Sequence, residues 1–386
     1  MLNFLKYAFY LSFFMLLVAC TTNTQEGSKE KGYITKVGEG TEEIKILVVS
    51  GTPYEMGLEQ GKLLKDEIQE NLDNFLSFTQ QEANSIYNEE QFYKALDDAW
   101  VANSPYIDQR VIDEMKGISE GSGATLQMIQ RAHMIPVISP YSCSGVIVWG
   151  KATKNNHTYQ LRNLDFTMGA KLQDHPVVTI YKPANGTAHA NVSFAGYIAS
   201  HTGMNANHIV FGEKGQSPGK EFPYDIKGVH FSFLFRALMY DATSLDNTLD
   251  MVKSAQLIKR YFLFFGDGNS ATMGGAKALV STPDEVKLSI WKDNDPKDIV
   301  APNVLENVVY YTMDNGKAFE LLKKNLGSFD EQKMIEISKT VASPGGNLVD
   351  VVYDATTLEM WVAYANGSED AAKQPYVHIN MNDYLK

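Results

Sequence analysis

The spacing of hydrophobic residues divides the chain into a helical part followed by a part rich in strands. Residues 44–49 are mostly β-branched and aliphatic and predict a strand. Beyond it, the patterns over 89–102, 107–120 and 125–134 are typical of helices with one buried face. We therefore expect residues 33–142 to form a mainly helical segment.

The first helix of this segment has a clear start signal. Thr52 can cap the helix, Pro53 suits its first position, and Glu55 completes a capping box. Gly57 and Gly61 then fall on one helical face. Because each glycine costs about 1 kcal/mol relative to alanine inside a helix, we expect this face to pack closely against another element.

Glycine and proline mark the end of the helical segment. Gly121 and Gly123 are expected to stop the helix over 107–120. Pro136 and Pro140 then lead from the last helix to residue 143. The chain changes character at this point.

Beyond residue 143, short strands alternate with helices. The expected strands are 145–149, 157–164, 177–181, 190–194, 209–212, 261–266, 277–281, 286–291, 348–353 and 358–364. The expected helices are 231–240, 245–255 with Ser244 as cap, 314–326 and 330–340. This order favours sheets covered by helices, so residues 143–386 are expected to form an α+β layered core.

The N-terminus predicts export and anchoring. Residues 1–19 carry one charge and a run of apolar residues that is too short to span a membrane. Their ending, Leu-Val-Ala followed by Cys20, resembles a bacterial lipoprotein signal, which implies acylation of Cys20 and a location in the bacterial cell envelope, on the periplasmic or surface side. Residues 20–32 are polar and predict a flexible tether. An ordinary secretory peptide with an incidental cysteine is the alternative.

Composition narrows the partners. The net charge of −12 makes nucleic acid an improbable partner. Only two cysteines are present, so packing rather than disulfides must stabilise the fold. The eight histidines are scattered without metal-binding spacing, and no cofactor or metal is expected.

Cys143 is the candidate nucleophile. A hairpin that begins at Cys143 and returns through Arg162 and Asp165 would bring a guanidinium and a carboxylate to the thiol. An arginine favours the reactive thiolate, and an aspartate can orient the α-amine if Cys143 becomes a chain terminus. That amine could then act as general base. A structural ion pair beside a buried cysteine is the alternative.

Several segments resemble one enzyme family. The hairpin residues 141–145 and 159–166 resemble the nucleophile hairpin of N-terminal-nucleophile (Ntn) cysteine hydrolases, which include choloylglycine hydrolases, acid ceramidases and the peptidase C45-like acyltransferases that use acyl-coenzyme A and 6-aminopenicillanic acid. Residues 51–61, 203–205 and 349–363 are similar to further elements of the C45-like group. The resemblance covers nearly all of the chain after the tether.

The resemblance implies a fold and a reaction. It implies an αββα sandwich made as a precursor, which cuts its own Ser142–Cys143 bond and frees the amine of Cys143. Arg162 would contact the nucleophile or the substrate carbonyl region, and Asp165 would orient the amine. The expected activity is cleavage or transfer of the acyl group of a small N-acyl amide through a Cys143 thioester. The acyl group, the amine and the oligomeric state are not specified.

The chain departs from the family at the oxyanion hole. Related enzymes supply an asparagine beyond the element at 203–205, but residues 211–215 contain none. Losing one such donor raises the barrier by roughly 3–4 kcal/mol. Asn205 and Asn269 are the candidate replacements, although each is also a typical turn residue.

Two rival interpretations use the same residues. A papain-like enzyme would pair Cys143 with His201 or His230, without a local signature to support it. A surface lipoprotein that keeps the Ntn fold and binds a ligand without turnover is consistent with the missing asparagine. The joint presence of Cys143, Arg162 and Asp165 favours catalysis.

Overall fold

The computed structural model describes residues 31–40, 43–139, 141–215, 226–258, 261–281, 287–292, 303–311 and 316–386. Lys31–Lys386 form one compact unit. The signal, Cys20, nearly all of the tether and Pro140 lie outside the described residues. The predicted tether ends at Gly32, which is already the first residue of strand β1. No helix in the described part is long and apolar enough to cross a membrane.

Two sheets form the centre of the compact unit. The first has the strand order β1-β2-β5-β6-β7-β8-β9-β10-β11 and the second the order β12-β3-β4-β13-β14-β15. The strands of the first sheet are β1 (Gly32–Val37), β2 (Ile44–Gly51), β5 (Pro176–Pro183), β6 (His189–Phe194), β7 (Thr202–Asn205), β8 (Ile209–Gly215), β9 (Tyr261–Asp267), β10 (Gly274–Ser281) and β11 (Lys287–Lys292). Those of the second are β12 (Val308–Tyr311), β3 (Ser142–Val148), β4 (Tyr159–Asp165), β13 (Asn347–Asp354), β14 (Glu359–Tyr364) and β15 (Val377–Asn380).

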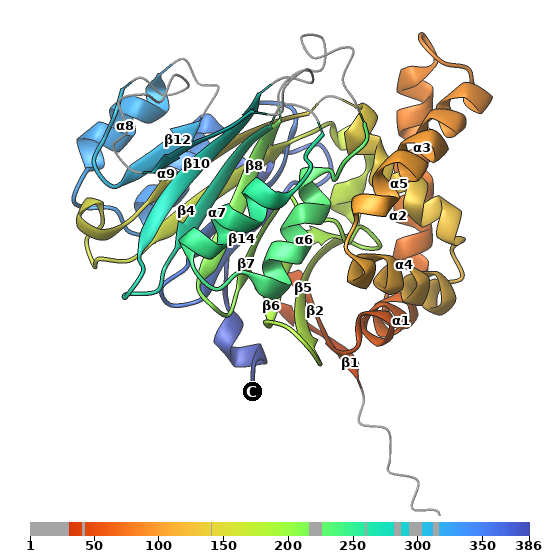
Figure 1. The fold of residues 1–386 in the computed structure, drawn as a ribbon, viewed down its shortest axis with the longest axis horizontal. Helices are drawn as coiled ribbons and strands as arrows, with labels where there is room; N and C mark the ends of the chain where they lie inside the picture. Colours follow the sequence, from red (N-terminus) through yellow and green to blue (C-terminus); the bar gives the residue numbers. More distant parts are fainter. Residues whose placement is uncertain are drawn as a thin grey trace, which may run out of the picture. The chain divides into compact units, whose positions relative to one another are not determined.

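Some helices cover the outer faces of the sheets, and others pack on one another beside the first sheet (Figure 1). They are α1 (Pro53–Leu63), α2 (Lys65–Ala83), α3 (Glu89–Asn103), α4 (Gln109–Ser122), α5 (Leu126–Ile138), α6 (Phe231–Asp241), α7 (Leu245–Ser254), α8 (Lys317–Asn325) and α9 (Glu331–Val341). Helices α6 and α7 contact the first sheet, α9 contacts β4 and β13 of the second, and β3 contacts β8 and β9 across the interior. The expected α+β sandwich of four layers, αββα, is therefore confirmed.

The start of the helical segment forms as its sequence predicts. Thr52 is the N-cap of α1, and both hydrogen bonds of the capping box with Glu55 are present. The glycine prediction is also confirmed: a Cβ atom on Gly57 would lie 2.1 Å from the carbonyl oxygen of Glu114, and one on Gly61 would lie 2.7 Å from that of Ile118. Helices α1 and α4 are thus packed backbone to backbone.

Other details of this segment differ from expectation. Gly123 ends α4 in the left-handed conformation, but Gly121 lies inside the helix, where it packs against α1. Pro136 lies inside α5, which runs on to Ile138. The segment also contributes β2 to the first sheet, where it pairs with β5. Short-range pattern could not reveal this parallel pairing between strands far apart in the sequence.

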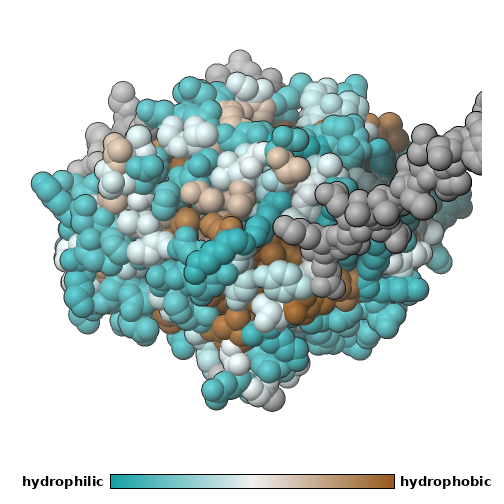
Figure 2. Space-filling model, turned by 90° about the horizontal axis from the view of Figure 1, so that it is seen from below, coloured by the Kyte–Doolittle hydropathy of each residue, from teal (hydrophilic) through white to brown (hydrophobic). Residues whose placement is uncertain are grey.

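The apolar side chains lie mainly between the layers. One large cluster joins the first sheet to its helices and includes Cys143, while a second joins α8 and α9 to the outer face of the β3–β4 hairpin. The face in Figure 2 carries mostly hydrophilic side chains, with hydrophobic ones gathered in small groups between them. The buried layers thus fix the hairpin from both sides.

Candidate active site

The β3–β4 hairpin places the predicted residues on its two faces. Cys143 pairs with Leu164, Gly145 with Arg162, and Ser142 with Asp165. Since directly opposite residues share a face and neighbours alternate, Cys143 and Arg162 face the first sheet. Asp165 lies on the outer face, across from Ser142. The Ser142–Cys143 peptide bond therefore has Arg162 on the inner face of the hairpin and Asp165 on the outer face.

Cys143 and Arg162 are in direct contact. Nη2 of Arg162 lies 2.9 Å from Sγ of Cys143, and both side chains are buried. A guanidinium at this distance favours the thiolate over the thiol. The hairpin predicted from sequence thus brings these two residues together as expected.

Glu213 is the charged partner of Arg162, and the sequence interpretation did not assign it a role. Its Oε2 lies 3.6 Å from Nη2 of Arg162, and its backbone oxygen accepts from Nε at 3.4 Å. Tyr141 donates to Oε1 of Glu213 at 2.9 Å. Nη1 of Arg162 is buried and makes no hydrogen bond to any described residue. That nitrogen therefore has donor capacity that the described residues do not use.

Lys214 adds a second cation that sequence reasoning missed. It is 3 % exposed, and its Nζ lies 4.3 Å from the centre of the Tyr311 ring. Tyr311 pairs with Gly145, two residues along β3 from Cys143. Burial lowers the pKa of Lys214, while the charges of Cys143, Glu213 and Asp165 oppose that shift. The signal in the sequence was a Glu-Lys pair at the end of an otherwise apolar strand.

Asp165 is held from the outer face. Its Oδ1 accepts from the backbone N–H of Ser343 at 3.1 Å and from Nδ2 of Asn347 at 3.2 Å. Burial raises the pKa of Asp165, whereas these hydrogen bonds and the charge of Arg162 oppose the rise. The carboxylate is thus fixed beside the residue that precedes the nucleophile.

Asn205 does not supply an oxyanion donor in this structure. Its Nδ2 donates to the carbonyl oxygen of Ala242 at 2.9 Å, and its Oδ1 accepts from the backbone N–H groups of Asn207 and Ile209. The side chain therefore caps the region where α6 ends. The two bonds to Oδ1 are local, whereas the bond to Ala242 depends on a tertiary contact that the local sequence does not encode.

Asn269 also lies away from Cys143. It is in the turn between β9 and β10, where its Oδ1 accepts from the N–H of Ala271 at 3.0 Å. The adjacent Asp267 carbonyl accepts from Thr158, which precedes β4 at the opposite end of the hairpin from Cys143. Asn205 and Asn269 therefore both act as turn residues in this structure, which was the alternative to an oxyanion donor.

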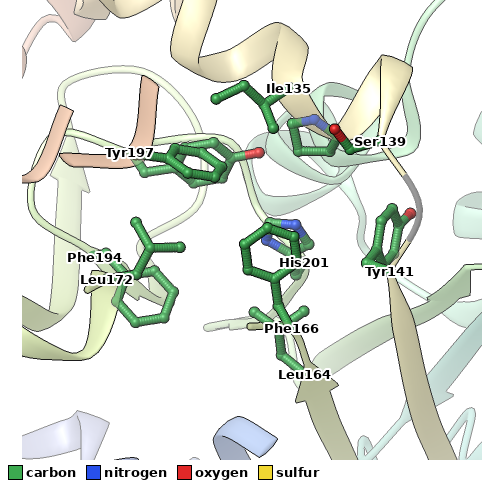
Figure 3. Close-up of a pocket in the computed structure, with 11 residues that line it drawn as sticks. Ile135, Ser139, Tyr141, Leu164, Phe166, Leu172, Phe194, Tyr197 and His201 are labelled. Atoms are coloured by element: carbon green, nitrogen blue, oxygen red, sulfur yellow. The ribbon is translucent and has the colours of Figure 1, made fainter. Parts of the chain in front are cut away.

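A narrow apolar pocket lies beside the strand partner of Cys143. Its lining is almost wholly apolar, and Leu164, the partner of Cys143 in the hairpin, forms part of its wall (Figure 3). Ser139 and Tyr141, which come just before the nucleophile, line it as well. Its volume of about 30 Å³ holds no more than a few water molecules.

The two histidines of the rival interpretation have packing and capping roles. His201 lies among the rings of Tyr141, Tyr197 and Phe231, and burial lowers its pKa well below the usual range. His230 caps α6 by accepting from the N–H of Ser232. Among the described residues, no group of three or more acidic, histidine or cysteine side chains could hold a metal ion.

The chain is similar in sequence to proteins of Dictyostelium discoideum and Archaeoglobus fulgidus. No protein-family model matches it. It is 28% identical to the protein dcd1A of Dictyostelium discoideum over 369 residues, which covers 87% of this chain and 82% of the relative. It is 26% identical to dcd1B of the same organism, covering 73% of this chain and 59% of the relative. An uncharacterised protein of Archaeoglobus fulgidus is 21% identical, covering 86% of this chain and 65% of the relative.

Solved structures of amide hydrolases are also similar. An N-acylethanolamine-hydrolyzing acid amidase ortholog of Caenorhabditis elegans matches 61% of this chain and 98% of its own, with 16% identity and a TM-score of 0.42. Penicillin V acylase of Agrobacterium tumefaciens matches 63% and 88%, with 13% identity and a TM-score of 0.42. A conjugated bile acid hydrolase of Clostridium perfringens matches 63% and 94%, with 13% identity and a TM-score of 0.41. Because these scores lie below 0.5, the functional interpretation rests on the site itself.

Proposed function

We propose that this protein is a self-processing cysteine amidohydrolase or acyltransferase of the Ntn type. The observation that carries the proposal is the buried contact of 2.9 Å between Sγ of Cys143 and Nη2 of Arg162, at the open end of a hairpin in which Ser142 pairs with Asp165. This arrangement supports a reactive thiolate beside a peptide bond and a carboxylate beside the amine that the cut would free.

Self-cleavage would begin at Sγ of Cys143. The thiolate attacks the carbonyl carbon of Ser142, the carbon–nitrogen bond breaks, and the Cys143 nitrogen takes up a proton. Water then attacks the resulting thioester, so that Ser142 gains a carboxylate and Sγ is released. The product is an N-terminal cysteine whose amine lies on the side of Asp165.

Amide cleavage would repeat the same chemistry on a substrate. The freed amine accepts the thiol proton, Sγ attacks the substrate carbonyl carbon, and the amine passes the proton to the leaving nitrogen. Water or a second amine then takes the acyl group from Cys143. Nη1 of Arg162 and the Lys214 cation are the proposed stabilisers of the oxyanion, in place of the absent asparagine.

The pocket supports an apolar acyl group. Its walls of aliphatic and aromatic side chains offer almost no polar surface to a substrate. Ser139 and Tyr141 belong to the chain that ends at the proposed cut. Cleavage would release this part of the wall, so the pocket could widen to admit an acyl chain.

We also propose that Cys20 carries a lipid anchor at the bacterial envelope. The support is the apolar run of residues 1–19 and the small residues before Cys20. Growth with a clickable fatty acid tests this: wild type should be labelled and Cys20→Ala should not. Equal labelling of the two would contradict the anchor.

A trapping experiment tests the enzymatic proposal. Purified protein is incubated with decanoyl aminomethylcoumarin amide, and both coumarin release and the mass of the Cys143-containing chain are measured. We expect coumarin release and, after acid quench, a decanoyl adduct on Cys143, with neither in Cys143→Ala. Saturable binding of the amide without adduct or release would instead support the ligand-binding lipoprotein.

A further inference from the structure

Asp165 shares its hydrogen-bond donor with a second carboxylate. Nδ2 of Asn347 donates to Oδ1 of Asp165 at 3.2 Å and to Oδ1 of Asp350 at 2.6 Å. Asn347 and Asp350 are completely buried. Two carboxyl groups so close together in a buried site cannot both ionise without a large penalty.

The surrounding amides have fixed orientations. Oδ1 of Asn347 accepts from the backbone N–H of Ala372 at 2.8 Å, so its Nδ2 must face the two carboxyl groups. Nδ2 of Asn163 donates to the carbonyl oxygen of Ser338 at 2.8 Å, so its Oδ1 faces the Ser338 hydroxyl at 2.7 Å. Because an amide oxygen only accepts, the Ser338 proton points to Asn163.

The hydroxyl of Tyr376 links Ser338 to Asp350, so the protons in this chain of contacts can be counted. It lies 3.0 Å from Oγ of Ser338 and 2.8 Å from Oδ2 of Asp350. Ser338 has already donated its proton, so its contact with Tyr376 is a hydrogen bond only if Tyr376 donates to it. The contact between Tyr376 and Asp350 is then a hydrogen bond only if Asp350 supplies a proton. With Asp350 ionised, one of the two contacts of Tyr376 lacks a proton.

We propose that Asp350 is a positioning residue that stays protonated and thereby leaves Asp165 as the only anion of the pair. The inference rests on the proposed function, in which Asp165 orients the freed amine of Cys143. A charge on Asp350 would compete for the Asn347 amide and raise the proton affinity of Asp165. Loss of the Asp350 proton would therefore loosen the hold of Asp165 on the amine.

The electrostatics of the cluster agree with the proton count. Burial raises the pKa of Asp350 to about 8, and the charge of Asp165 adds to the rise, while the hydrogen-bond contacts with Asn347 and Tyr376 and the charge of Arg162 oppose it. Lys339, whose Nζ lies 5.3 Å from the centre of the Tyr376 ring, and Asp370, which accepts from the N–H of Asn347, also face this cluster.

Asp350→Asn tests the proposal, because asparagine can accept from Asn347 and donate to Tyr376 but cannot ionise. Turnover of decanoyl aminomethylcoumarin amide by the processed enzyme is measured from pH 5 to 9.5. An acid with a pKa near 8 is about one-tenth protonated at pH 9, so the ratio of variant to wild-type rate should rise about tenfold between pH 7 and 9. Parallel profiles would overturn the proposal.

Asp370→Asn is the matched control. Asp370 accepts from the backbone N–H groups of Gly345 and Asn347 on the same loop, so the variant removes a nearby carboxylate without touching the Tyr376 hydroxyl. Its profile should parallel wild type. If both variants change the pH profile equally, the change comes from losing any nearby negative charge, and the proposal for the Asp350 proton is overturned.

A second measurement separates this inference from the proposed function. In Cys143→Ala, which stays uncut, denaturant unfolding is followed from pH 4 to 9 with and without Asp350→Asn. The raised pKa means that the stabilisation from protonated Asp350 is complete below about pH 4 and is lost as pH rises through about 8. The uncut chain should lose stability relative to Asp350→Asn over this range. If the stabilities of the two uncut chains change with pH in parallel, Asp350 is not protonated in the folded protein, whether or not the enzyme turns over. If the stabilities diverge with pH but the processed enzyme shows no turnover, only the role of Asp350 in catalysis is overturned.

Discussion

Two buried arginine–glutamate pairs in this protein differ in which side chain lies nearest to the arginine. Arg236 on α6 places Nη2 at 2.5 Å from Oε2 of Glu114 on α4, and its guanidinium lies over the Tyr181 ring at 4.2 Å. Arg162 lies 3.6 Å from the carboxylate of Glu213 and only 2.9 Å from the thiol of Cys143. One pair joins two helices, whereas the other presents its cation to a nucleophile.

An unbonded nitrogen does not by itself distinguish the two pairs. Nη1 of Arg162 and Nε of Arg236 are both buried without a hydrogen bond to the described residues. The pairs differ in the distance between the carboxylate and the guanidinium. Tyr141 donates to Glu213 and helps to hold its carboxylate farther from Arg162 than Glu114 lies from Arg236. A buried cation that is only loosely matched by its carboxylate retains charge for chemistry.

Breaking the tight pair should have the largest effect on stability. Arg236→Met leaves Glu114 buried without its cation, so the free energy of unfolding of uncut Cys143→Ala should fall by about 3–5 kcal/mol. Burial already raises the pKa of Glu114, and the change would raise it further. Denaturant unfolding measures the loss.

Arg110→Met is the control for that substitution. Arg110 pairs with Asp108 and Asp241 at a more exposed position and lies over the Tyr240 ring, so its loss should lower the free energy of unfolding by only about 1–2 kcal/mol. Equal losses for the two variants would contradict the structural role given to Arg236.

Breaking the loose pair should affect chemistry first. Arg162→Met removes the cation at Sγ of Cys143, and self-cleavage should slow by roughly 10²–10³-fold, the range seen when one oxyanion donor is lost. The half-time of cleavage after refolding measures this on gels. Arg162→Lys should recover part of the rate, because it retains a charge. Unchanged cleavage in Arg162→Met would show that the thiol does not need the guanidinium.

Lys214 offers a smaller test of the same idea. Lys214→Met should slow self-cleavage about tenfold, or ~1.4 kcal/mol of barrier, because a second buried cation near Cys143 is lost. Lys277→Met is matched, since Lys277 is also buried and donates to the carbonyl oxygen of Tyr310 on the same strand as Tyr311. It should leave the cleavage rate unchanged; equal slowing would assign the effect to packing.

The smallest expected effect comes from Gly212, which packs on the arginine. A Cβ atom there would lie 3.1 Å from Cγ of Arg162. Gly212→Ala should shift the guanidinium slightly and slow cleavage several-fold, with about 1 kcal/mol of destabilisation. Gly274→Ala, whose Cβ would lie 3.2 Å from Leu245, should destabilise similarly without slowing cleavage. If Gly212→Ala and Gly274→Ala cleave themselves at similar rates, self-cleavage does not depend on the position of the Arg162 guanidinium.

The sequence predicted those features that local pattern encodes. The Thr52 cap, the close packing of Gly57 and the hairpin that joins Cys143 to Arg162 all depend on short spacing, and the structure bears them out. The turn role of Asn205 is local, but its contact with the end of α6 could not be predicted, because Ala242 lies more than thirty residues along the chain. The roles of Asn347 and Asp350 likewise emerge only when β13 pairs with β4.

Intact mass spectrometry under denaturing conditions tests the central claim most directly. Wild type and Cys143→Ala are purified and given the same time to mature. The account predicts that wild type separates into two chains, one ending at Ser142 and the other spanning Cys143–Lys386, while the variant stays whole. Wild type that remains whole under conditions where it is folded would contradict self-processing and, with it, the free amine on which the proposed chemistry depends.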